Sequence, residues 1–187
     1  MTKKIYRIIS WSLLILFLIS ILLILRKPSV APVPTSPEAG KSFDQKIQEL
    51  QTAHQQGTPK EIRITESELN AKLQEGMQEA SAAPSGPAAL KAATIHLEGD
   101  KFVGTFTVNV SGKDIYVTLG GKLGVSNGTL QLTPTEVRMG SLPVPISVVE
   151  STLRDKLNSP TMRDRMKLPD SIKDVRIENG ELVLQSQ

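Results

Sequence analysis

The sequence predicts an α+β fold: a curved antiparallel β-meander packed against a long helix, preceded by one N-terminal transmembrane helix. Three observations lead to this prediction. The chain begins with an uncharged apolar run between basic residues. Roughly fifty central residues alternate between apolar and polar side chains, which is typical of strands with one buried face. Segments with three- and four-residue apolar spacing flank that alternation and predict helices.

The N-terminal apolar run extends from Ile8 to Leu25. Eighteen helical residues at ~1.5 Å each span about 27 Å, close to the thickness of the hydrocarbon core of a bilayer. Basic residues flank the run on both sides: Lys3, Lys4, Arg7, Arg26 and Lys27. The larger positive charge before the run favours a cytoplasmic N-terminus and an extracytoplasmic domain, with the reverse orientation as the alternative.

A cleaved signal peptide is the competing interpretation of this run. Ser29-Val30-Ala31 offers small residues suited to cleavage after Ala31. The run is longer than the usual apolar region of a signal peptide, and Arg26-Lys27 separates it from that site. These two features favour an uncleaved signal-anchor.

The sequence divides into three parts. Residues 1–27 form the predicted anchor with its basic flanks, and residues 28–40 form a linker. Four prolines make this linker extended and stiff, as a spacer from a bilayer requires: Pro28, Pro32, Pro34 and Pro37. Residues 41–187 are sufficient for one α+β domain with a single core.

Two helices and a short strand are expected before the meander. Ser42 and Gln45 have the spacing of a capping box, which predicts a helix beginning there. Glu61–Ile64 alternates as a short strand. Thr65 and Glu68 form a second capping box. The helix that follows carries an apolar stripe of Leu69, Leu73 and Met77, and residues 81–87 are expected to be a flexible loop.

The meander is expected from Thr94 to Met139. Turns are indicated at Gly99, at Ser111-Gly112 and at Asn127-Gly128, the last being a type I′ hairpin signal. Pro134 interrupts the alternation, which then resumes with the opposite parity. The sheet therefore has one apolar face and bends where glycine and proline interrupt its strands.

A helix and a hairpin are expected to close the chain. Pro143 and Pro145 precede a stripe at helical spacing that consists of Ile146, Val149, Leu153 and Leu157. Residues 159–169 are expected to form a loop or a short helical turn. Asn179-Gly180 then marks a final hairpin.

Composition excludes several classes of function. After the anchor, 17 basic and 19 acidic residues remain, so nucleic-acid binding has little electrostatic support. The chain has no cysteine, which excludes disulfides, thiolate metal sites and cysteine nucleophiles. One basic segment is either a solvated helix end or a patch for anionic headgroups or a partner: Arg154, Lys156, Arg163, Arg165 and Lys167.

The sequence contains no catalytic constellation. His54 and His96 lie far from each other in sequence and at no metal-ligand spacing. Glu66 and Glu68 are explained by the helix start that they occupy. No phosphate-binding loop or nucleophile motif is present. We therefore expect no enzymatic activity, no metal and no cofactor.

Three short motifs carry a resemblance to known proteins. Thr65–Asn70 reads Thr-Glu-Ser-Glu-Leu-Asn, Gly140–Pro145 reads Gly-Ser-Leu-Pro-Val-Pro, and Ile177–Val183 contains the closing hairpin. Across roughly Glu61 to Gln185 the chain resembles small membrane-anchored envelope proteins of the YpmS and YceB kind. The resemblance implies half of a tubular lipid-binding (TULIP-type) module, in which a curved sheet wraps a long helix around an apolar groove. It implies no catalytic residues.

The apolar residues of sheet and helix admit two arrangements. They either pack as a closed core or line a groove for acyl chains. The candidates are Phe102, Phe106, Val108, Val110, Ile115, Val117, Leu119, Leu123, Val149, Leu153 and Leu157. The sequence thus predicts a domain that binds or shields membrane lipid or another apolar envelope component. The alternative is a non-enzymatic scaffold for another envelope protein. The sequence predicts no oligomeric state.

Overall fold

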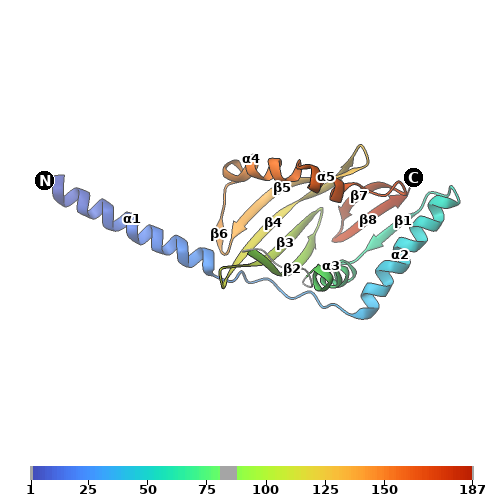
Figure 1. Ribbon diagram of the computed structural model, residues 1–187, viewed down its shortest axis with the longest axis horizontal. Coiled ribbons are helices and arrows are strands. Elements are labelled where there is room, and N and C mark those ends of the chain that lie inside the picture. Colours follow the sequence, from blue (N-terminus) through green and yellow to red (C-terminus); the bar gives the residue numbers. More distant parts are fainter. Residues whose placement is uncertain (1, 81–87, 187) are drawn as a thin grey trace.

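The computed structural model describes residues 2–80 and 88–186 and has the predicted α+β architecture, with an antiparallel β-meander (Figure 1). The loop expected at residues 81–87 lies outside the described residues. The elements are α1 (Thr2–Leu25), α2 (Pro37–Gln55), β1 (Glu61–Ile64), α3 (Glu66–Ala80), β2 (Ala88–Glu98), β3 (Lys101–Val110), β4 (Lys113–Ser126), β5 (Thr129–Met139), β6 (Leu142–Pro143), α4 (Ile146–Leu157), α5 (Pro160–Met166), β7 (Ile172–Glu178) and β8 (Glu181–Ser186).

The meander sheet has the strand order β2-β3-β4-β5-β6, and every neighbouring pair is antiparallel. Its predicted turns are confirmed. Asn127 and Gly128 both have positive φ, at 52° and 69°, as a type I′ turn requires. Asn179 and Gly180 close the β7–β8 hairpin in the same way, at 53° and 79°.

The phase change at Pro134 is a β-bulge. Gly120 pairs with Glu136, whereas Gly121 pairs with Pro134, so one residue of β5 is left over between them. A Cβ on Gly121 would lie 2.6 Å from the carbonyl oxygen of Thr133. Glycine is therefore required where β4 bends around the bulge.

A second sheet completes the fold. Its order is β1-β8-β7, so the short strand β1 adds to the C-terminal hairpin. The hairpin was predicted, but its pairing with Glu61–Ile64 was not, because sequence alternation does not identify a distant partner. The buried core forms where this sheet meets α2 and one end of the meander, and it contains Leu50, Ile62, Ile64, Leu97, Phe102, Val175, Ile177, Leu182 and Leu184.

The start of α3 is bonded to the outer edge of β2. The side-chain amide of Asn70, which is 2% exposed, donates to Ile95 O at 2.6 Å and accepts from Ile95 N at 2.8 Å. Glu66 Oε1 accepts from the backbone N–H of Leu97 at 2.5 Å. These side chains replace a neighbouring strand and satisfy backbone groups that would otherwise be exposed at the sheet edge.

Glu68 joins α3 to α2. Its carboxylate accepts from Lys46 Nζ at 2.8 Å, from Ser42 Oγ at 2.5 Å and from Thr65 N at 2.8 Å. The Thr65 hydroxyl oxygen in turn accepts from Glu68 N at 3.3 Å, so the second capping box is confirmed. Thr65–Asn70, noted in the sequence for its resemblance, thus serves a structural purpose here.

The first capping box is not formed. α2 begins at Pro37, and Ser36 is its N-cap, accepting from Ala39 N at 3.2 Å. Proline at the first helical position suits this start. Ser42 lies inside the helix and bonds Glu68 instead. Residues 37–40 are therefore helical rather than part of an extended linker.

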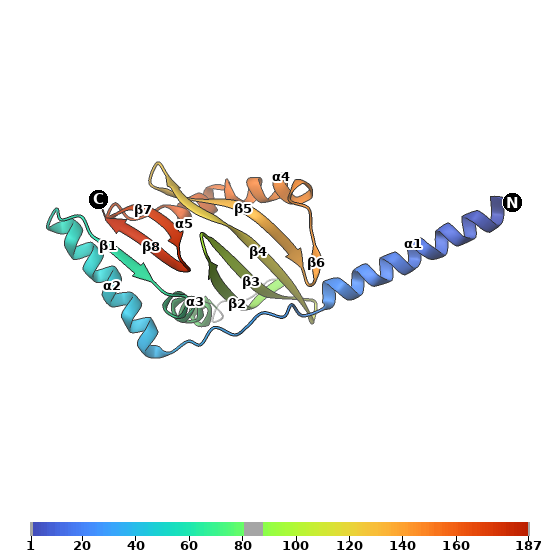
Figure 2. The same ribbon diagram turned by 180° about the vertical axis from the view of Figure 1, so that it is seen from behind.

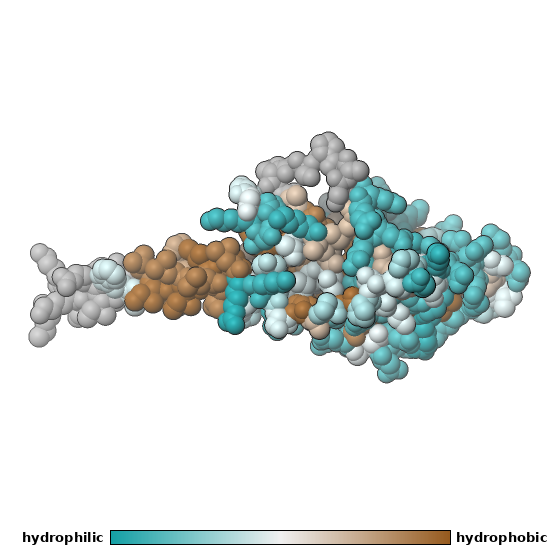
Figure 3. Space-filling view, turned by 90° about the horizontal axis from the view of Figure 1, so that it is seen from below, coloured by the Kyte–Doolittle hydropathy of each residue, from teal (hydrophilic) through white to brown (hydrophobic). Residues whose placement is uncertain are grey.

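Helix α1 projects from one end of the body (Figures 1 and 2), and Figure 3 shows its apolar surface beside the mostly hydrophilic domain. Within the described part of the chain, no helix reaches the length and apolarity that crossing a membrane needs.

The C-terminal end of α1 contacts the β5–β6 turn. Ser141 N donates to Leu23 O at 2.8 Å, and a Cβ on Gly140 would collide with the carbonyl oxygens of Leu23 and Ile24.

The linker lies against the domain instead of extending away from it. Residues 28–31 border a cavity on the polar face of the meander, together with Thr105, Thr118 and Glu136. Further along, Ser67 Oγ donates to Pro34 O at 2.8 Å. The linker therefore runs from the α1 end of the body to α2 along the sheet (Figure 2).

We expect Asn70→Ala to lower the free energy of unfolding by about 2–4 kcal/mol, because it leaves the N–H and C=O of Ile95 without partners at a buried edge. Chemical denaturation of the full chain in mild detergent measures this. Asn158→Ala, at the exposed end of α4, is the matched control and should cost less than about 1 kcal/mol. Equal effects of the two substitutions would contradict the role given to Asn70.

We expect the protein to lose stability as the pH falls below about 4.5, through Glu68. Burial alone would raise its pKa, but hydrogen bonds from Lys46, Ser42 and Thr65 outweigh burial and lower the pKa from 4.5 to about 2. The folded state therefore binds fewer protons than the unfolded state, and the stabilisation present above pH 4.5 is lost toward pH 2.

The corresponding measurement is denaturation of the full chain and of Glu68→Gln between pH 7 and pH 2. Glu68→Gln should be less stable at pH 7 by about 2–3 kcal/mol and should show a shallower acid dependence. If the stability of Glu68→Gln fell with pH as steeply as that of the unsubstituted protein, the acid sensitivity would arise from other groups.

Candidate functional site

The apolar face of the meander changes from buried to exposed along its strands. At the end that meets the second sheet, Leu97 and Phe102 are 5% and 9% exposed. In the middle of β3, Phe106 is half-buried. At the end near α1, Val110 is 37% exposed and Leu90 is 48% exposed. One face is thus core at one end and open at the other.

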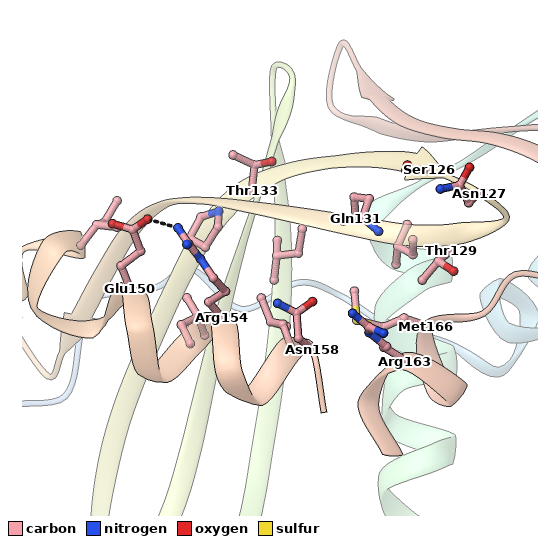
Figure 4. Close-up of a pocket in the computed structure, with 16 residues that line it drawn as sticks. Ser126, Asn127, Thr129, Gln131, Thr133, Glu150, Arg154, Asn158, Arg163 and Met166 are labelled. Carbon is pink, nitrogen blue, oxygen red and sulfur yellow. Dashed lines mark hydrogen bonds and ion pairs between the residues drawn. The ribbon is translucent and has the colours of Figure 1, made fainter. Parts of the chain in front are cut away.

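Helix α4 lies along β5 without closing this face. No residue of α4, which the structure describes throughout, is buried. Between α4, α5 and β5 lies a cavity of about 670 Å³ (Figure 4). Its apolar lining is Leu130, Leu132, Pro134, Ile146, Leu153, Leu157 and Met166. The helix stripe therefore faces the sheet across a space, not through close packing.

Polar side chains surround this apolar lining. Figure 4 shows Arg154 and Asn158 extending from α4 toward β5, where Gln131 and Thr133 lie. Arg154 Nη2 pairs with Glu150 Oε1 at 2.5 Å. Arg163, from α5, lines the same cavity. This cavity combines apolar and polar lining residues, with two guanidinium groups and the Glu150 carboxylate at its border, and so suits an amphiphile with a polar end.

The predicted groove residues fall into three sets. Phe102 belongs to the buried core, and Leu119 and Leu123 pack partly against that core. Half-buried residues on the open face are Phe106, Val108, Ile115 and Val117. On α4, Leu153 and Leu157 line the cavity, whereas Val149 is half-buried outside its lining.

The predicted basic patch is divided by the structure. Arg154 and Arg163 line the cavity, while Lys156, Arg165 and Lys167 are exposed outside it. The backbone of Lys167 forms an isolated bridge with Thr129, which fastens the chain after α5 to the start of β5. The predicted patch therefore consists of two arginines that line the cavity and three basic side chains that are exposed to solvent beside it.

Sequence reasoning missed the part of the site contributed by β5. Leu130 and Leu132 line the cavity, and their alternation after Asn127-Gly128 was visible in the sequence. They lie on the face of β5 that α4 covers, and α4 is brought to that face because β6, which leads into it, pairs with Arg138 and Met139 of β5. Sheet order is a tertiary property that alternation does not encode.

A second cavity, of about 490 Å³, lies on the polar face beneath the linker. His96 lines it, and its Nδ1 is 3.5 Å from Glu66 Oε2. Its buried Nε2 has no hydrogen-bond partner among the described residues. The described part of the chain holds no group of three or more His, Asp or Glu side chains arranged to bind a metal ion.

In comparisons with known proteins, the chain matches no family model, no curated protein and no solved structure.

We expect Leu153→Ala to cost about 1 kcal/mol or less, because this side chain borders a cavity instead of filling a core. Leu184→Ala is the matched control, since Leu184 is 6% exposed in the core, and it should cost about 2–5 kcal/mol. Urea denaturation of both variants checks the difference. A large loss for Leu153→Ala would indicate a closed core beneath α4.

Proposed function

We propose that this protein is a membrane-anchored, extracytoplasmic domain that binds or shields a lipid or another apolar envelope component in the groove between the meander and α4. The observation that carries this proposal is the incompletely covered apolar face, bordered by a cavity of about 670 Å³. A stable domain ordinarily closes its apolar faces, so an open one beside a cavity favours a ligand.

Acyl chains fit the chemistry of the groove. Each methylene buried against its apolar lining would contribute roughly 0.8 kcal/mol. Arg163 and Arg154 lie at its border, where an anionic headgroup would meet them. The resemblance to TULIP-type modules agrees with this ligand class. No catalytic role is proposed for any residue.

Helix α1 is the proposed anchor. The sequence contains the uncharged run Ile8–Leu25, and most of its described large side chains are exposed, including Trp11 at 61% and Leu22 at 69%. A helix that is apolar all round and packs on the domain only at its end is suited to lipid surroundings. The basic residues before the run favour an N-terminus in the cytoplasm.

A scaffold for another envelope protein is the second candidate. It is favoured by the outer edge of β5, where residues 130–136 pair with no further strand among the described residues. Such an edge accepts an added strand from a partner. In that case the cavity between α4 and β5 would receive side chains of the partner.

Native mass spectrometry of the full chain, extracted in mild detergent, tests the proposal. We expect an adduct of lipid mass that survives removal of the detergent. Leu153→Trp, which fills the groove, should raise the apparent dissociation constant of the lipid about tenfold, which corresponds to a loss of roughly 1.4 kcal/mol of binding free energy. Ser151→Trp places the same group on the exposed side of α4 and should retain the adduct.

A clean apo mass, under conditions that preserve a known lipid complex, would contradict the lipid proposal and favour the scaffold. Equal retention of the adduct by both tryptophan variants would show that the lipid binds outside the groove.

A further inference from the structure

Exposed apolar side chains gather at the end of the domain from which α1 leaves. Beyond residue 30, the large apolar side chains that the described structure leaves exposed are Leu90 at 48%, Val110 at 37% and Val148 at 69%. Single exposed apolar residues are ordinary on a protein surface. These three side chains are of interest because they lie at the same end of the domain.

Strand register places Leu90 and Val110 at one end of the meander. Leu90 pairs with Val108, and Val110 is the last residue of β3, beside the β3–β4 turn. The β5–β6 turn lies at the same end, because Gly140 N donates to Tyr116 O at 2.7 Å, three residues from the start of β4.

Helix α1 ends at that turn. Leu23 O accepts from Ser141 N, so the last turn of α1 is capped by the domain itself. Figures 1 and 2 both show α1 leaving from this end, where β6 lies and where α4 begins. Val148 is the third residue of α4. All three exposed side chains therefore lie at the end of the domain from which α1 leaves.

Basic side chains accompany this apolar end. Lys91 follows Leu90, Lys113 pairs across the turn with Val110, and Arg26-Lys27 follows α1. Lys91 is paired with Asp114 at 2.8 Å. Apolar side chains among lysines and arginines are typical of surfaces that enter the interface of an anionic bilayer.

We propose that Leu90, Val110 and Val148 form a rim that inserts into the headgroup–acyl interface of the bilayer that holds α1. This inference rests on the proposed function of α1 as an anchor. The open end of the apolar face then lies at the interface of that bilayer.

Because the chain has no native cysteine, single-cysteine variants report position without background. Full chains carrying Leu90→Cys, Val110→Cys or Val148→Cys are labelled with nitrobenzoxadiazole. They are reconstituted in vesicles of phosphatidylcholine with a minor share of phosphatidylglycerol. Lys101→Cys, at the β2–β3 turn, is the surface control at the opposite end. Leu18→Cys, in α1, tests the anchor itself.

A lipid with a nitroxide near its headgroup should lower the emission of the three rim labels about twofold and leave the Lys101→Cys label unchanged. A nitroxide deep in the acyl chain should quench Leu18→Cys. Quenching of Leu18→Cys without quenching of the rim labels would overturn the rim and leave the anchor standing. Failure to quench Leu18→Cys would overturn the anchor, and with it this inference.

Discussion

The bonds from the start of α3 to the edge of β2 determine how the rest of the structure is arranged. Asn70 pairs with both backbone groups of Ile95, and Glu66 accepts from Leu97. Because β1 immediately precedes α3, these bonds hold the small sheet against the meander. Glu68 extends the same assembly to α2. The buried core, and therefore the fixed end of the apolar face, depends on this junction.

Burial is divided unequally between the two ends of the molecule. The small sheet, α2 and α3 close the core. Helices α4 and α5 cover β5, but none of their residues, all of which the structure describes, is buried. Elements with little buried apolar surface open at low free-energy cost. A ligand between α4 and β5 thus requires little disruption of the part that keeps the protein folded.

Local signals in the sequence predicted much of the fold. Asn127-Gly128 and Asn179-Gly180 specified their turns, and Pro134 marked the bulge, because positive φ and a missing N–H act within a few residues. The start of α2 was misplaced, since Ser42 and Gln45 imitate a capping box whose serine bonds Glu68. The pairing of β1 with β8 and the β5 side of the cavity depend on distant contacts that no local pattern contains.

The course of the linker has a mechanical consequence. α1 meets the domain at Ser141, but the next helix begins only after Ser36, and the segment between the two helices lies along the polar face. Nine residues, 28–36, can extend by roughly 30 Å at most. With α1 held in a bilayer, a domain that detached from the end of the helix would stay within that distance of the membrane surface. On the proposed function, a domain tethered in this way would exchange its ligand with the membrane beneath it and not with a distant one.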